Sequence, residues 1–133
     1  MFRSFLIYLS KAAWAQNLVT NWSFAWRTAS RFIAGKKLDD AMRVVRELNA
    51  KGINATLDHL GEHTNTPGES QQATDDIFAT LDALGADPTA RSNVSIKLTQ
   101  IGLGMDENLC AQNLERILAR AKQNNTFVRV DIE

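Results

Sequence analysis

The chain has 133 residues, of which 44% are hydrophobic and 23% charged, as in an ordinary soluble domain or a part of a larger protein. Its 15 basic and 15 acidic side chains balance, so no net positive field is available to hold nucleic acid. The single cysteine, Cys110, excludes an intrachain disulfide and is typical of a reducing compartment such as the cytoplasm.

The first 52 residues are predicted to be helical. Apolar side chains recur every three or four residues in three successive stretches, 5–13, 22–33 and 38–48, which is the spacing of one helix face. Gly35 and Gly52 stand where the second and third helices should end, and Asp39 and Asp40 suit the start of the third. We therefore expect a helical segment over residues 1–52.

The aromatic N-terminus imitates a secretory signal. Its apolar run, residues 5–9, is too short for a secretory core, and no stretch reaches the roughly 20 apolar residues of a membrane span. The three tryptophans are interpreted as core residues or as contacts with the rest of the protein. A peripheral membrane contact through Phe2, Phe5 and Trp14 is the alternative.

From residue 53 the pattern changes to alternating strands and helices. Strands are predicted at about 53–60, 93–100 and 127–132, and helices at about 69–85 and 106–123, with Asp106 as a helix N-cap. Strands separated by helices of this length form right-handed βαβ units with a parallel sheet. We expect residues 53–133 to form a unit distinct from the helical segment.

The three predicted strands share a pattern of faces. One face of each is polar near the carboxyl end, and the opposite face is apolar or small; the polar residues are Thr56, Asp58, Ser95, Lys97, Thr99, Arg129 and Asp131. A doubly wound sheet would need two apolar faces, whereas a (β/α)₈ barrel has an inward polar site at its carboxyl mouth. The fold class predicted is α/β: N-terminal helices followed by the first three strands of a TIM-type barrel. Because such a barrel needs about 250 residues, we expect a longer protein.

Lys97 is costly to bury near the end of a strand without a partner. Asp58 and Asp131, on the neighbouring strands, are the candidates, and we expect the three charges to converge at the same sheet edge. Lys97 has three interpretations: a Schiff-base nucleophile, a permanent cation that binds an anionic substrate, or a structural ion pair. Two nearby carboxylates favour the protonated amine and therefore the cation. Asp131 would orient the lysine, accept a proton or contact a cofactor, and Arg129 would pair with a neighbour.

Two other features are assigned to structure. His59, Glu62 and His63 fit the H-x-x-E-H pattern of some zinc proteases, but that pattern requires a helix, and Gly61 interrupts it. We interpret the segment as a strand end and its loop, and predict no metal. Cys110 lies on the apolar face of a helix and is interpreted as a core residue.

The sequence also resembles a known family. Residues 55–62 (ATLDHLGE), 93–103 (NVSIKLTQIGL) and 127–133 (FVRVDIE) resemble the first three barrel strands of proline dehydrogenase, most closely the short monofunctional bacterial type. The N-terminal region, including residues 31–35 (RFIAG), resembles the helices that precede that barrel.

This resemblance implies a distorted (β/α)₈ barrel that binds FAD, oxidises L-proline to Δ¹-pyrroline-5-carboxylate and passes electrons to quinone, in the cytoplasm or peripheral to the inner membrane. Lys97 matches the lysine that pairs with the proline carboxylate. Asp131 matches the third-strand aspartate near flavin and lysine, Ile132 a residue whose backbone lies by the flavin, and Asp58 a first-strand aspartate that shapes the site.

The family's paired arginines and most of its flavin contacts belong to later strands, so these 133 residues alone are expected to be inactive. Two other functions stay open on the residues alone: a Schiff-base lyase or aldolase that uses Lys97, and a non-catalytic fragment that binds a partner.

Overall fold

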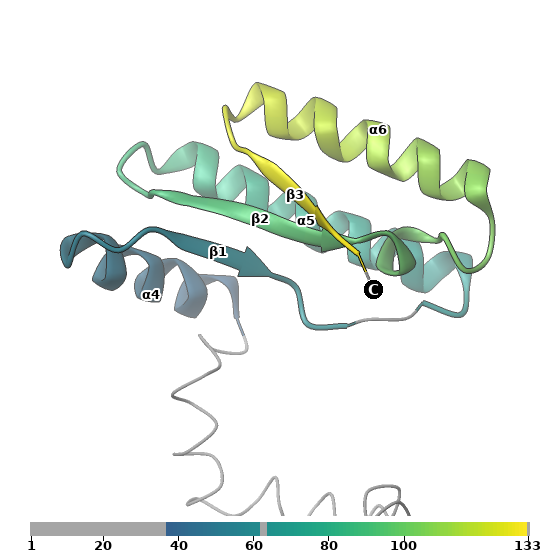
Figure 1. The fold of residues 1–133 in the computed structure, drawn as a ribbon, viewed down its shortest axis with the longest axis horizontal. Helices are drawn as coiled ribbons and strands as arrows, with labels where there is room; N and C mark the ends of the chain where they lie inside the picture. The colour runs from purple at the N-terminus through teal and green to yellow at the C-terminus, as the bar shows by residue number, and fades with distance from the viewer. Residues whose placement is uncertain (1–36, 62–63, 133) are drawn as a thin grey trace, which may run out of the picture. The chain divides into compact units, whose positions relative to one another are not determined.

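The computed structural model describes residues 37–61 and 64–132. In chain order the elements are α4 (Leu38–Ala50), β1 (Ala55–Asp58), α5 (Pro67–Ala86), β2 (Ser92–Lys97), the 3₁₀ turn η1 (Leu98–Ile101), α6 (Glu107–Gln123) and β3 (Val128–Asp131) (Figure 1). The helices predicted before residue 36, with their tryptophans, lie outside the described residues.

The helices begin and end where the sequence provides caps. Thr66 accepts a hydrogen bond from the Glu69 N–H, and the Glu69 side chain accepts from the Thr66 N–H, so α5 starts in a capping box. The Asp106 side chain accepts hydrogen bonds from the Asn108 and Leu109 N–H groups in the first turn of α6, which confirms the predicted N-cap. After α4, Gly52 adopts a φ of +77°, a left-handed conformation that glycine reaches without strain.

The sheet is parallel throughout, in the order β1-β2-β3, as the strand spacing predicts. Figure 1 shows α5 and α6 running along the sheet, with α4 beside β1. The core lies between the apolar sheet face and the helices; it consists of Met42, Ile77, Leu81, Leu84, Val94, Ile96, Ile101, Cys110, Ile117 and Ala121. Cys110 is 4% exposed, which confirms the interpretation of this thiol as a core group. The division of the chain after residue 52 stays a prediction, although Met42 of α4 shares the core of the strands.

The second strand is shorter than predicted. It ends at Lys97, and Leu98–Ile101 forms η1 instead of continuing the strand to residue 100. Leu98 and Ile101 are three residues apart, so both can face the core from a single 3₁₀ turn. Gly102, with a φ of +116°, then redirects the chain. The strand alternation that was predicted to include Thr99 therefore stops at Lys97.

The apolar face of β3 is only partly covered. Val128 packs against the core, but Val130 is 40% exposed and Ile132 97% exposed.

No described helix is both long and apolar enough to cross a membrane.

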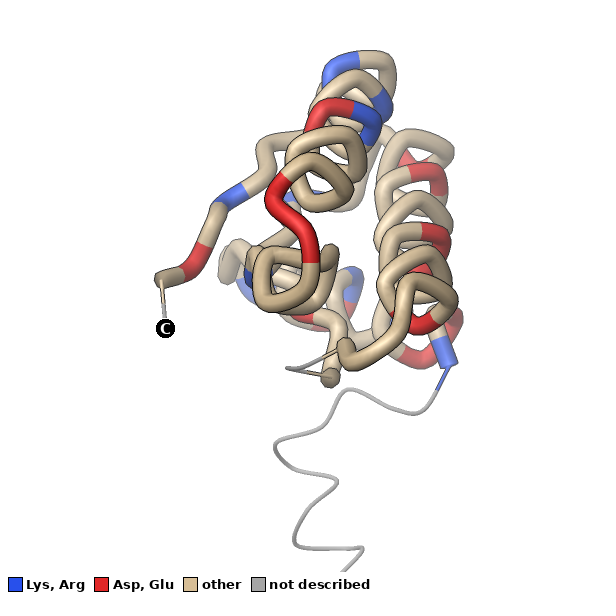
Figure 2. The backbone as a smooth tube through the Cα atoms, turned by 90° about the vertical axis from the view of Figure 1, so that its right-hand side faces the viewer, with Lys and Arg blue, Asp and Glu red and all other residues tan. Residues whose placement is uncertain are grey.

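Helices α5 and α6 have complementary charges. Figure 2 shows acidic but no basic positions along α5, and basic positions near the end of α6. Arg116 and Arg120 of α6 lie 5.2 and 5.5 Å from the centre of the Phe78 ring on α5, and Arg120 lies 3.3 Å from Asp82. These contacts fix the two helices against each other behind the sheet.

Candidate functional site

The polar ends of the three strands lie side by side. Asp58 of β1 is in register with Ser95 of β2, and Lys97 of β2 is in register with Asp131 of β3. Residues in register on parallel strands project from the same sheet face, and Ser95 and Lys97 are two positions apart. Asp58, Lys97 and Asp131 therefore lie on one face at the carboxyl ends of adjacent strands.

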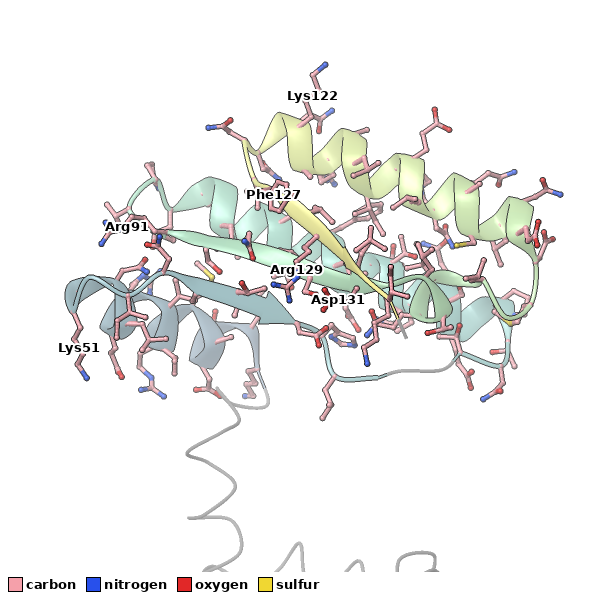
Figure 3. All side chains as sticks on the ribbon, in the orientation of Figure 1. Lys51, Arg91, Lys122, Phe127, Arg129 and Asp131 are labelled. Carbon is pink, nitrogen blue, oxygen red and sulfur yellow. The ribbon has the colours of Figure 1, made fainter. Side chains whose placement is uncertain are left out.

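Asp131 is held by two partners. Arg129, two residues earlier on the same face, donates from Nε to Oδ1 at 2.7 Å and from Nη2 to Oδ2 at 3.2 Å. Ser95 Oγ on β2 donates to Oδ2. Figure 3 shows Arg129 and Asp131 together beside β3. The Arg129 hydrogen bond, followed by the Ser95 hydrogen bond, lowers the pKa of Asp131, and the same contact raises the pKa of Arg129. The carboxylate is thus ionised and fixed in orientation.

Asp58 has a different environment from Asp131. Its partial desolvation raises its pKa, and the nearby Asp131 carboxylate acts in the same direction, against the opposing effect of Lys97. The two acids therefore differ in protonation behaviour although they share one sheet edge. Pairs of carboxylates in environments of this kind are able to take different roles.

Lys97 is half-buried at the last position of β2. Its charge lowers the pKa of both Asp58 and Asp131, as expected for an ammonium group between two acids. Its backbone N–H donates to Gln100 Oε1 at 3.0 Å.

The H-x-x-E-H segment begins after β1 has ended at Asp58. His59 follows β1 directly, with Nε2 3.5 Å from Asp76 Oδ2 of α5, and Glu62 and His63 lie outside the described residues. In the part of the chain that the structure describes, no group of three or more metal-ligating side chains is close enough to hold a metal ion.

The two residues predicted to contact a cofactor, Asp131 and Ile132, stand at the end of β3. Ile132 directly follows Asp131 and belongs to the opposite, apolar face of the strand, so only its backbone adjoins the face that carries Asp131. A flavin at this edge would lie against the Ile132 backbone and near the Asp131 carboxylate. The remaining walls of such a site are not formed by the described residues.

Comparison with known sequences identifies the family. The sequence profile of the family described as proline dehydrogenase matches residues 41–133. The chain belongs to the proline dehydrogenase family. Its resemblance to this family, predicted from the strand motifs, is confirmed.

Proline dehydrogenases of two organisms align with the chain. Proline dehydrogenase 2 of Bacillus subtilis is 31% identical over 98% of the chain, and proline dehydrogenase 1 of the same organism is 34% identical over the whole chain. A proline dehydrogenase of Deinococcus radiodurans is 37% identical over 81% of the chain. The chain spans 43%, 43% and 36% of these relatives.

A solved structure has the same arrangement of elements. Proline utilization A from Bdellovibrio bacteriovorus, inactivated by N-propargylglycine, superposes with a TM-score of 0.75 over 90% of the chain and 14% of that protein. At 20% identity this likeness concerns the fold alone.

Two side-chain contacts at this sheet edge are missed by sequence reasoning. The bond from Ser95 to Asp131 depends on the register of two strands, which no local pattern fixes. Gln100 was placed within a strand; the recurrence of Leu98 and Ile101 at i and i+3, followed by glycine, was the signal for a turn.

Proposed function

We propose that this chain supplies the first three strands of a (β/α)₈ barrel that oxidises L-proline to Δ¹-pyrroline-5-carboxylate with FAD as cofactor. The observation that carries the proposal is the position of Lys97, in a chain of the proline dehydrogenase family, between Asp58 and Asp131 at the carboxyl edge of the sheet. In a barrel, this edge is where substrates bind.

In this proposal Lys97 binds the carboxylate of proline. Two nearby acids favour the protonated form of an amine, which suits a fixed cation rather than an amine nucleophile. A clamped carboxylate limits the ring to a few orientations and sets which ring carbon faces the cofactor. Such positioning accounts for a large share of many enzymatic rate enhancements.

Asp131 and Ile132 would lie at the cofactor, and Asp58 would shape the opposite side of the site. FAD supplies the hydride acceptor when it is bound. Asp131, held by Arg129 and Ser95, presents an ionised group that keeps the Lys97 ammonium oriented. Ile132 would offer its backbone to the flavin edge.

The same two acids weigh against a Schiff-base lyase or aldolase. A nucleophilic lysine needs a neutral amine at working pH, which burial or a neighbouring cation provides. Asp58 and Asp131 instead favour the charged form of the Lys97 amine.

The complete enzyme would pass electrons to quinone, with a peripheral contact to the inner membrane from the cytoplasmic side. This part of the proposal rests on the family alone. Residues 1–133 by themselves would hold the lysine and both aspartates but would not turn over proline, because the described face covers only one side of a substrate.

Absorbance spectroscopy on the complete gene product tests the proposal. The purified protein should show a visible flavin band that L-proline bleaches and D-proline does not. Borohydride trapping with carbonyl substrates should leave Lys97 unmodified. A protein without flavin, or a flavin band that L-proline leaves unchanged, would reject the proposal, and covalent trapping at Lys97 would support the lyase.

A further inference from the structure

Gln100 lies where β1 has ended while β2 still continues. Asp58, the last residue of β1, pairs with Ser95, and β2 runs two residues further to Lys97. In a parallel sheet the N–H groups of a central strand alternate between its two neighbours. The Val94 N–H donates to the carbonyl oxygen of Phe127, the residue before β3, at 3.1 Å, so the Lys97 N–H, three positions later, is directed to the β1 side.

The side-chain amide of Gln100 takes the place that a longer β1 would occupy beside the Lys97 N–H. Its Oε1 accepts from the Lys97 N–H at 3.0 Å, and its Nε2 donates to the His59 carbonyl oxygen at 2.7 Å. The side chain is 1% exposed. One end must accept and the other must donate, so neither a methionine nor an ionised glutamate of similar length can make both bonds.

The turn that carries Gln100 is itself fixed on two sides. Thr64, in the loop after β1, donates from Oγ1 to the Thr99 carbonyl at 3.0 Å. Asn113 of α6 is 2% exposed and donates to the Ile101 carbonyl at 3.1 Å. The turn that carries the Gln100 amide is therefore held in place by hydrogen bonds from two other segments.

We infer that Gln100 is a positioning residue that joins the carboxyl ends of β1 and β2 and so sets the place of the Lys97 ammonium relative to Asp58. The inference rests on the proposed function, in which that ammonium binds the carboxylate of proline. If Lys97 moves, the proline carboxylate is bound less tightly, so the KM for proline should rise, and kcat should fall only as far as the bound ring loses its orientation.

Asn49 provides a matched control at the opposite end of the same strands. Its Nδ2 donates to the carbonyl oxygens of Ile53 and Arg91, at 2.9 and 3.0 Å, and its Oδ1 accepts from the Arg91 N–H at 2.6 Å. It thus joins the amino ends of β1 and β2 as Gln100 joins their carboxyl ends. Loss of either bridge should reduce stability, but only loss of the second should affect Lys97.

The experiment compares Gln100→Met with Asn49→Leu in the complete gene product. In Gln100→Met we expect the KM for L-proline to rise by about tenfold with a smaller change in kcat, and the flavin content to be kept. Amide hydrogen exchange at Lys97 should become faster, because its acceptor is lost. Asn49→Leu should lower the unfolding midpoint and leave both the KM and the exchange at Lys97 close to those of the native protein.

An unchanged KM in Gln100→Met, or an equal rise in both variants, overturns the inference, and so does unchanged exchange at Lys97. If Gln100→Met does not fold, Gln100→Glu is measured instead; it keeps the acceptor for Lys97 and loses the donor to His59. A raised KM there supports the inference and a native KM overturns it. If the native protein does not oxidise proline, the proposed function fails, and the exchange at Lys97 alone decides whether the bridge exists.

Discussion

Arg129 and Asp131, two positions apart on β3, form an ion pair in which Nε lies 2.7 Å from Oδ1. Oδ1 accepts from Arg129, and Oδ2 accepts from both Arg129 and Ser95 of β2. Asp131 therefore stands in its site as an oriented anion whose position depends on its own strand and on the adjacent one. Lys97 on β2 is in register with Asp131, so the lysine stands next to an anion that is held in one orientation.

Replacing Arg129 by methionine should raise the pKa of Asp131 toward its ordinary value, because the hydrogen bond that lowers it most is lost. The Ser95 bond should keep the pKa from rising all the way. Carboxyl carbon chemical shifts of Asp131, followed against pH, measure the change. Arg91→Met is the control, since Figure 3 shows Arg91 at the other end of the sheet. Identical titration of Asp131 in the native protein and in Arg129→Met would contradict the described contact.

The Asp87 carboxylate should stabilise the protein in a pH-dependent way. It accepts from the Arg46 Nε at 2.8 Å and the Thr89 hydroxyl at 2.6 Å, and these bonds, Thr89 first, lower its pKa to about 2. A depressed folded-state pKa gives stability that is present above the unfolded-state pKa of about 3.9 and is lost as the pH falls toward about 2.

The urea midpoint of Asp87→Asn should therefore lie below that of the native protein at pH 6, and the two should approach each other as the pH falls from about 5 to about 2. Asp75→Asn is the control, because the Asp75 carboxylate accepts from Gln71 one turn earlier in the same helix and bridges no separate elements. A difference between native protein and Asp87→Asn that is constant with pH would show that charge is not the cause.

Gly85→Ala should destabilise the protein although alanine is the better helix former. A Cβ atom at residue 85 of α5 would lie 2.4 Å from Asn124 Oδ1 and 2.8 Å from Asn124 Cβ. The second atom adjoins the backbone, so a change of rotamer does not remove the overlap. We expect a loss of about 1–3 kcal/mol in the free energy of unfolding, measured by urea titration.

Gly68→Ala in the same helix is the matched control, because the nearest atom to a Cβ there is 4.0 Å away. The double variant Gly85→Ala with Asn124→Gly should recover part of the loss. If Gly85→Ala is as stable as Gly68→Ala, the packing of α5 against the end of α6 is not as described.

Much of the fold follows from local patterns in the sequence. The alternation through Val94, Ser95 and Ile96 correctly predicts a strand, and Asp106 correctly predicts where α6 begins. Membership of the family could also be predicted, because the strand motifs are long, in order and correctly spaced. These signals depend on residues near each other in the chain.

The finer geometry of the site could not be predicted in the same way. The bond from Ser95 to Asp131 requires the register of β2 and β3, and the bridge from Gln100 to His59 requires the positions of two strand ends. The alternation places Val130 on the apolar face of β3, but it does not predict whether other residues cover that face. The roles of Lys97, Asp58, Asp131 and Ile132 stay predictions.

Lys97→Met in the complete gene product tests the central role. The substitution keeps most of the length of the side chain and removes the charge, so proline should lose one charged hydrogen bond to its carboxylate, about 1.5–3 kcal/mol, or roughly 10- to 150-fold in affinity. The flavin should be retained, because the proposal places Lys97 at the substrate. Titration of the flavin spectrum with L-proline under anaerobic conditions measures the affinity.

Lys122→Met is the matched control, because Lys122 lies in the last turn of α6 and points away from the sheet (Figure 3). It should bind proline as the native protein does. If Lys97→Met also does so, Lys97 is a structural ion-pair partner of the two acids and the substrate carboxylate is bound elsewhere. If Lys97→Met loses the flavin together with proline, the lysine supports the whole carboxyl edge of the sheet and its role is not confined to the substrate.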